Sequence, residues 1–298
     1  MGIESAFFFR FPDHIRLRQN NFMAGPTTLS NGGTHPMIDL LSRCNTNLAT
    51  LGCCHGQTPC DCYQCLRGGF YPGMPDNYDC RKKLSYYVLN YGPSYASEIY
   101  HYLRSSQILE YFVPQGVVNI LSLGCGFAPD LVAIDKYVQD HDLQLQVNYT
   151  GVDGSDFWTP SRYTTTTSEF HVGDVTQYMR LRDFDLIFVV KLFSTLYHNN
   201  QYDPFIRLMQ EKVQNEMAAG SHLIFNDVNS IHTGRDVFHN SIRHNFRGLR
   251  QYFFGNPPYS EQSWVHLNTQ QIPFNIPAQL TVQPLRDMRN TVIFEYRK

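Results

Sequence analysis

The sequence contains little charge and no long apolar run. Charged residues make up 17% of the 298 residues, and 24 basic side chains nearly balance 26 acidic ones. The formal net charge of −2 therefore gives no general attraction to nucleic acid or to acidic membranes. The densest apolar run, Phe184 to Phe193, is interrupted by Asp185 and Lys191 and is far shorter than the roughly 18 residues that a membrane span needs. We expect no membrane-spanning segment.

The start of the sequence also lacks targeting signals. The stretch MGIESAFFFRF has no long apolar region of the kind that a secretory signal contains. Ala6 stands where a myristoylation signal has Ser or Thr. These features predict a cytoplasmic protein.

Cysteine is scarce outside one stretch of the chain. Seven of the eight cysteines lie between Cys44 and Cys80, and the eighth, Cys125, lies in a later glycine motif. In a chain without an export signal, such clustering favours metal binding over disulfides. One tetrahedral zinc ion is the first prediction; reduced thiols, a disulfide or an iron–sulfur cluster are the alternatives. The predicted zinc ligands are Cys54, Cys60, Cys62 and Cys65.

Two parts of the sequence differ in pattern. Residues 1–93 form a cysteine-rich, loop-rich region, in which zinc would compensate for a poor hydrophobic core. Residues 94–298 alternate helical and strand patterns, which is typical of an α/β domain with a mostly parallel sheet covered by helices on both faces. The last two extended runs, 279–282 and 291–296, have no helix between them. They predict an antiparallel pair of terminal strands at one edge of the sheet.

A glycine motif follows the first predicted strand of the second part, Val117 to Leu123. Gly124 and Gly126 lack a Cβ, so a ligand can approach the backbone closely at the carboxyl end of this strand. The second predicted strand ends in Asp153, whose carboxylate could accept hydrogen bonds from both hydroxyls of a ribose. The third ends in Asp174, which could accept one from an adenine amine. The order and spacing of these residues are more specific than any one of them.

This arrangement resembles the class I S-adenosylmethionine-dependent methyltransferases, whose fold is Rossmann-like. Leu123-Gly-Cys-Gly126 matches their first motif, with Ser122 in the usual acidic place and Ala128 in the third glycine place. The resemblance covers residues 94–298, including the terminal strand pair. A dinucleotide cofactor is the alternative, but Phe127-Ala-Pro129 stands where a pyrophosphate needs an open helix N-terminus. The resemblance implies S-adenosyl-L-methionine as cofactor, bound by Gly124, Cys125, Gly126, Asp153 and Asp174.

Candidate residues for methyl transfer follow the fourth and fifth predicted strands, because ligands of such sheets bind beyond the carboxyl ends of the strands. Lys191, Asn226 and Asp227 are the predicted catalytic residues, and the alternative is that they are solvated strand-end residues. The methyl acceptor is not identified by the sequence: a small molecule or a protein is slightly favoured over RNA. A non-catalytic binding or adaptor protein with the same fold, using a metal-stabilised N-terminal region to hold a partner, is the alternative to the enzyme.

A basic stripe bears on the RNA alternative. Residues 234–253 are predicted to form a helix, on which Arg243, Arg247 and Arg250 would lie along one face. Such a stripe could contact RNA phosphates, although a run of charge is more often a solvated face.

Overall fold

The computed structural model describes residues 36–52, 60–68, 78–177, 180–255, 263–285, 288 and 290–298. All described elements belong to one compact unit, Thr34–Lys298. None of the described helices is long and apolar enough to cross a membrane.

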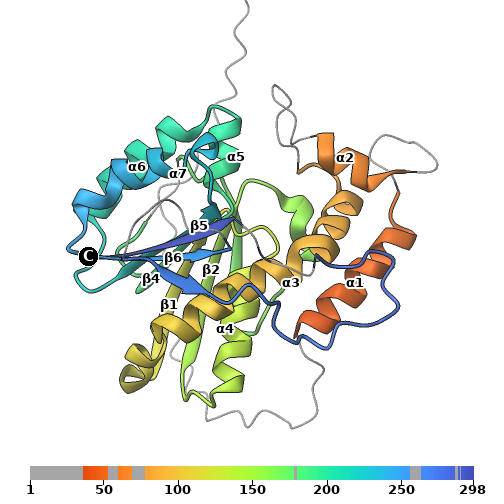
Figure 1. Ribbon diagram of the computed structural model, residues 1–298, viewed down its shortest axis with the longest axis horizontal. Coiled ribbons are helices and arrows are strands. Elements are labelled where there is room, and N and C mark those ends of the chain that lie inside the picture. The colour runs from red at the N-terminus through yellow and green to blue at the C-terminus, as the bar shows by residue number, and fades with distance from the viewer. Residues whose placement is uncertain are drawn as a thin grey trace, which may run out of the picture. The chain divides into compact units, whose positions relative to one another are not determined.

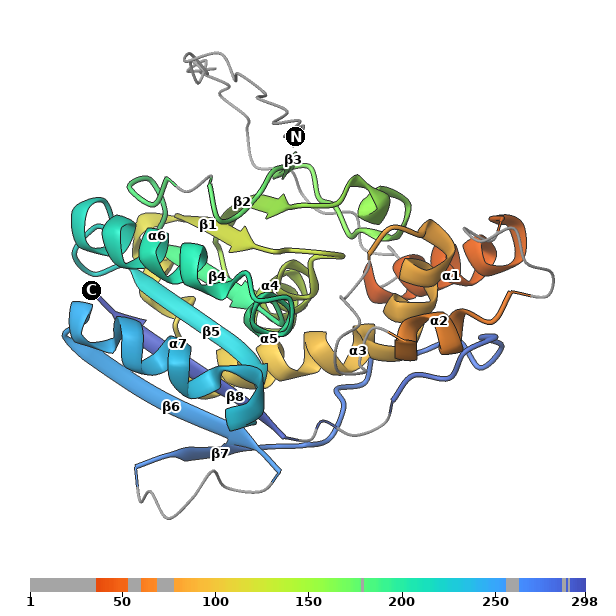
Figure 2. The same ribbon diagram turned by 90° about the horizontal axis from the view of Figure 1, so that it is seen from above.

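A single eight-stranded sheet organises this unit, with the strand order β3-β2-β1-β4-β5-β8-β6-β7. The strands are β1 Val117–Leu123, β2 Gln146–Asp153, β3 Ser168–Val172, β4 Leu186–Val190, β5 His222–Val228, β6 Gly248–Phe254, β7 Val265–Leu267 and β8 Thr291–Arg297. The first five strands are parallel, so their carboxyl ends share one edge of the sheet (Figure 2). Only β8 is antiparallel to its neighbours, β5 and β6. The predicted Rossmann-like α/β sheet, mostly parallel and with an antiparallel strand pair, is confirmed.

The terminal antiparallel pair differs from the prediction in its members and its place. The partner of β8 is β6, and residues 279–282 form no strand. The prediction of one helix over 234–253 is correct only for its first half. The helix in this region, α7 (Arg235–Ile242), ends at Ile242, and strand β6 follows. The aromatic residues at the end of β6 alternate between the two cores, Tyr252 and Phe254 on one face and Phe253 on the other, which is the period of a strand. Because β8 pairs on both sides, six of its seven residues are buried, and β7 is the edge strand on this side of the sheet.

Helices cover both faces of the sheet (Figure 1). The helices are α1 Pro36–Thr50, α2 Cys62–Gly68, α3 Arg81–Ser106, α4 Pro129–Asp140, α5 Phe193–His198, α6 Tyr202–Asn215 and α7, with short 3-10 turns that include η2 (Asp156–Ser161) and η4 (Arg243–Asn245). Helices α1, α3 and α4 contribute to the apolar core on one face, and α5, α6 and α7 to the core on the other. The cores meet at the sheet, as expected for a doubly wound α/β fold.

Helix α3 begins before the predicted domain boundary. It starts at Arg81, where the Cys80 thiol accepts a hydrogen bond from the backbone N–H of Lys83 at 3.5 Å, and it continues through Pro93. Residues that pack on the core, Leu84 and Val88 among them, extend its apolar pattern towards the N-terminus. The domain boundary predicted after residue 93 therefore falls inside α3, which packs against both α1 and α4.

Candidate functional site

The glycine turn after β1 is fixed by hydrogen bonds to the neighbouring strand. The backbone N–H groups of Gly124 and Cys125 donate to the carbonyl oxygen of Val152 in β2, at 2.8 and 3.1 Å. Gly124 and Gly126 have φ values of 65° and 51°, in the left-handed region that glycine adopts most readily. A Cβ on Gly124 would also lie 2.6 Å from Cδ1 of Leu192. Both the backbone conformation and the packing therefore require glycine at this position.

Asp153 links this turn to the end of β2. Its Oδ2 accepts a hydrogen bond from the backbone N–H of Gly126 at 2.8 Å, and its Oδ1 accepts one from Ser155 at 2.9 Å. Burial raises the pKa of this carboxyl, and the two backbone donors oppose that effect. Each oxygen keeps a further lone pair with which it can accept another hydrogen bond.

A cavity of about 630 Å³ opens beside these residues, at the carboxyl ends of the parallel strands. Asp174 lines it beyond β3 and is held by a hydrogen bond from the backbone N–H of Thr176 to its Oδ1 at 2.8 Å. Val172 and Val175 give this part of the cavity an apolar surface, although Val172 is 60% exposed. Six of the residues singled out in the sequence line the cavity: Gly124, Cys125, Gly126, Asp153, Asp174 and Lys191.

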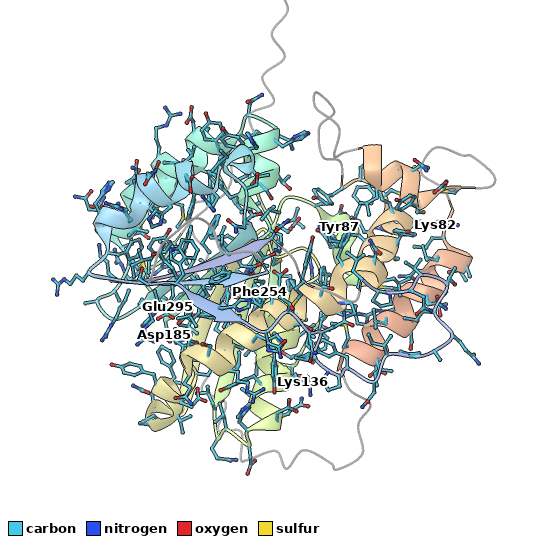
Figure 3. The ribbon with its side chains drawn as sticks, in the orientation of Figure 1. Lys82, Tyr87, Lys136, Asp185, Phe254 and Glu295 are labelled. Atoms are coloured by element: carbon cyan, nitrogen blue, oxygen red, sulfur yellow. The ribbon has the colours of Figure 1, made fainter. Side chains whose placement is uncertain are left out.

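Aromatic rings form another wall of the cavity. Tyr87 and Tyr95 line the cavity from α3, and Trp158 lines it from η2 (Tyr87 is labelled in Figure 3). The Tyr87 ring centre lies 5.6 Å from that of Trp158 and 6.1 Å from that of Tyr95. Burial raises the pKa of Tyr87 well above its usual value, so its phenol stays protonated at neutral pH. Tyr87 and Trp158 were not predicted, because neither lies in a motif and α3 brings Tyr87 to the site only through tertiary packing.

Lys191 lines the cavity, and its side chain is buried in an ion pair. Its Nζ lies 2.8 Å from Oε2 of Glu98 in α3 and donates to Oγ1 of Thr291 at 3.1 Å. The same Nζ lies 4.9 Å from the centre of the Tyr95 ring. The Lys191 side chain is only 9% exposed. In this arrangement it connects α3, β4 and β8.

Asn226 and Asp227 are buried in β5 and do not line the cavity. The Asn226 amide donates to Oε2 of Glu98 at 3.1 Å. The Asp227 carboxylate accepts hydrogen bonds from the backbone N–H groups of Ser194 at 2.9 Å and Val228 at 2.7 Å, and burial raises its pKa. The backbone N–H of Lys191 donates to the carbonyl oxygen of Asn226 at 2.8 Å, and of the three predicted catalytic residues only Lys191 lines the cavity.

The predicted zinc ligands are only partly described. Cys54 lies outside the described residues, whereas Cys60 and Cys62 have their Sγ atoms 3.6 Å apart, and Cys65 follows in α2. Within the described parts of the chain, no three His, Cys, Asp or Glu side chains lie close enough together to hold a metal ion. Cys44, outside the predicted set, is buried in α1, and burial raises the pKa of its thiol to about 12.

The arginines of the predicted basic stripe do not share a helical face. Arg243 lies in η4, Arg247 precedes β6, and Arg250 lies within β6. The register pairs Gly248 with Arg297 and Arg297 with His222, the first residue of β5. These arginines therefore lie towards the amino ends of the parallel strands, whereas the cavity lies at the carboxyl ends.

Comparison with family models finds no match, and comparison with curated proteins finds none. Among solved structures, the N-methyltransferase NodS from Bradyrhizobium japonicum WM9 in complex with S-adenosyl-l-homocysteine is 15% identical; the match covers 80% of this chain and 99% of that chain, with a TM-score of 0.38. A SAM-dependent methyltransferase from Archaeoglobus fulgidus is 11% identical over 66% and 94% of the two chains, with a TM-score of 0.37. A TehB-like SAM-dependent methyltransferase from Corynebacterium glutamicum is 13% identical over 65% and 86%, also with a TM-score of 0.37.

Proposed function

We propose that this chain is an S-adenosylmethionine-dependent methyltransferase. The observation that supports this function best is the cavity at the carboxyl edge, where the glycine turn, Asp153 and Asp174 follow one another along β1, β2 and β3. This is the place at which doubly wound sheets bind nucleotides. When bound, S-adenosylmethionine would supply a methyl group activated by a sulfonium.

The residues of the cavity fit such a cofactor in order. Asp153 would accept hydrogen bonds from the ribose hydroxyls with the lone pairs that Gly126 and Ser155 leave unused. Asp174 would accept one from the adenine amine, with Val172 and Val175 packing on the ring. The turn from Gly124 to Gly126 would contact the methionine part through its backbone.

We favour a small acceptor molecule. Tyr78, Tyr95 and Thr195 line the cavity together with the cofactor-binding residues. The Tyr78 hydroxyl lies 3.4 Å from Oγ1 of Thr195, so side chains from two separate parts of the chain are in contact at the cavity wall. The arginines that favoured RNA lie towards the opposite edge of the sheet. A protein or RNA acceptor is an outcome of the experiment below.

Calorimetry with S-adenosylhomocysteine tests the cofactor site. Asp153→Ala removes the acceptor for the ribose hydroxyls and should weaken binding about tenfold or more. Asp156→Ala is the matched control, because this exposed carboxylate lies three residues further along the chain and does not line the cavity. Wild-type protein that fails to bind S-adenosylhomocysteine would refute the function, and unchanged binding by Asp153→Ala would remove that residue from the site.

Turnover distinguishes the enzyme from an adaptor protein. The protein is incubated with S-adenosylmethionine carrying a labelled methyl group and with separate fractions of small molecules, proteins and RNA. Label in the small-molecule fraction supports our proposal, and label in another fraction identifies a different acceptor class. Binding of the cofactor without transfer to any fraction favours the adaptor.

For the cysteine-rich region we propose one bound zinc ion. Two thiolates at about 2.3 Å from a zinc ion, with sulfurs separated as in Cys60 and Cys62, make an angle of about 100° at the metal, close to tetrahedral. The remaining ligands would come from Cys65 and from the segment 53–59, which contains Cys54 and lies outside the described residues.

A further inference from the structure

Glu98 is a buried carboxylate to which no sequence motif assigns a role. It lies in α3, is 2% exposed, and accepts hydrogen bonds from three other elements. Its Oε2 lies 2.8 Å from Nζ of Lys191 and accepts from the Asn226 amide at 3.1 Å. Its Oε1 accepts from Oγ1 of Thr291 at 3.0 Å. One side chain therefore ties α3 to the ends of β4 and β5 and to the start of β8.

The residue paired with Glu98 has an uncommon backbone conformation. Lys191 has a φ of 54°, in the left-handed region, which is strained for a residue other than glycine. Its backbone N–H donates to the carbonyl oxygen of Asn226 at 2.8 Å. The chain then turns into Leu192, whose side chain packs so closely on Gly124 that a Cβ there would clash. The left-handed conformation of Lys191 thus directs the Leu192 side chain onto the glycine turn.

Glu98 also lies on the helix that carries the aromatic wall. Tyr87 and Tyr95 line the cavity from α3, while Leu192, Thr195 and Leu196 line it from the chain that follows β4. The Glu98–Lys191 pair connects these two walls. Buried ion pairs contribute little net stability, but the loss of one partner leaves an uncompensated buried charge. The position of one wall relative to the other therefore depends on both members of the pair.

We infer that Glu98 is a positioning residue, which holds the exit of β4 and the aromatic face of α3 in the arrangement that binds S-adenosylmethionine. This role rests on the proposed function, because it concerns the same cavity. Glu98 itself does not line the cavity, and it acts through Lys191.

Hydrogen exchange without ligand tests the positioning directly. In the full-length protein, Glu98→Gln should speed amide exchange in residues 191–196 about tenfold or more, because the Lys191 ammonium loses its counter-charge. Glu216→Gln is the control: Glu216, directly after α6, also pairs with a lysine at 2.8 Å and does not line the cavity. Its exchange in residues 191–196 should equal that of wild type. Equal exchange in Glu98→Gln would overturn the proposal.

Ligand affinity then tests the consequence for the site. Trp158 lines the cavity and the only other tryptophan is Trp264, so Trp264→Phe leaves a single reporter for S-adenosylhomocysteine. In this background, Glu98→Gln should weaken the affinity for S-adenosylhomocysteine about tenfold. Glu216→Gln should leave this affinity within about twofold of that of the parent. Affinity unchanged by Glu98→Gln, even with lower thermal stability, would reduce Glu98 to a structural residue and refute the inference.

A double variant separates positioning from general damage. Glu98→Gln with Lys191→Gly removes both charges and supplies the residue that adopts a positive φ without strain. Its affinity should stay about as low as in Glu98→Gln, because neither variant connects the two walls through this ion pair. Recovery to within about threefold of the parent would attribute the loss in Glu98→Gln to an uncompensated buried charge alone and would contradict the positioning role. If wild type itself does not bind S-adenosylhomocysteine, the proposed function fails, and the exchange experiment decides the role of Glu98 without it.

Discussion

The carboxyl group of Asp130 should make the stability of this protein depend on pH. Asp130 lies in the first turn of α4, directly behind the glycine turn, and is fully buried. Its Oδ1 accepts a hydrogen bond from the Tyr149 hydroxyl at 3.0 Å, whereas its buried Oδ2 has no hydrogen-bond partner among the described residues. Burial raises the pKa of this carboxyl from 3.8 to about 6, against the effect of the hydrogen bonds.

The sign and size of the effect follow from this difference in pKa. The folded state binds a proton more tightly than the unfolded state, so the contribution of Asp130 to stability is greatest below pH 3.8 and falls as the pH rises to about 6. A pKa difference of about 2 corresponds to about 3 kcal/mol. Asp130→Asn removes the ionisation and keeps the shape. It should leave stability nearly unchanged at pH 4 and raise it by on the order of 1–3 kcal/mol at pH 7, with part of the gain offset by the buried amide.

Urea unfolding of wild type and Asp130→Asn at several pH values between 4 and 7 measures this difference, since contributions from other groups cancel between the two proteins. Equal m values confirm that only stability has changed. Tyr149→Phe should act in the opposite direction, because it removes a donor to the carboxylate and raises the pKa of Asp130 further. A difference between wild type and Asp130→Asn that is constant over the whole range would refute the reasoning.

Three further predictions concern the metal, the glycine turn and the arginines. Elemental analysis of the reduced protein should find one zinc per chain, and chelation should speed proteolysis between residues 44 and 80; a metal-free protein would rule out the zinc. Gly124→Ala should lower the free energy of unfolding by on the order of 1–2 kcal/mol, whereas Gly52→Ala, with open space around its Cβ, should change it by less than about 0.5 kcal/mol. Replacing Arg243 and Arg247 by Ala should leave S-adenosylhomocysteine affinity within about twofold at physiological salt, and a larger loss would place them near the cavity.

The candidate cofactor residues were predictable because their places follow from chain order. Each parallel strand delivers the residue after it to the same edge of the sheet, so the glycine turn, Asp153 and Asp174 had to meet once β1, β2 and β3 were recognised. The strands were recognisable because buried parallel strands are short apolar runs. Periodicity was less informative in β6, where only the last three residues are buried and the histidines and arginines before it fall at helical spacing.

Glu98 illustrates what periodicity cannot predict. A charged residue in an amphipathic helical pattern is assigned to the solvent face, yet α3 is buried on nearly all sides at this point, including Ser97 and His101. The backbone N–H of Ile272 donates to Oγ of Ser97, so a distant segment of the chain covers this face of the helix. The counter-charge, Lys191, follows ninety-three residues later and is brought near by the connection from β3 to β4, which places β4 beside β1. A buried ion pair is therefore visible only when the fold is known. The sequence left Lys191 as either a catalytic residue or a solvated strand-end residue, and the structure buries its side chain against Glu98.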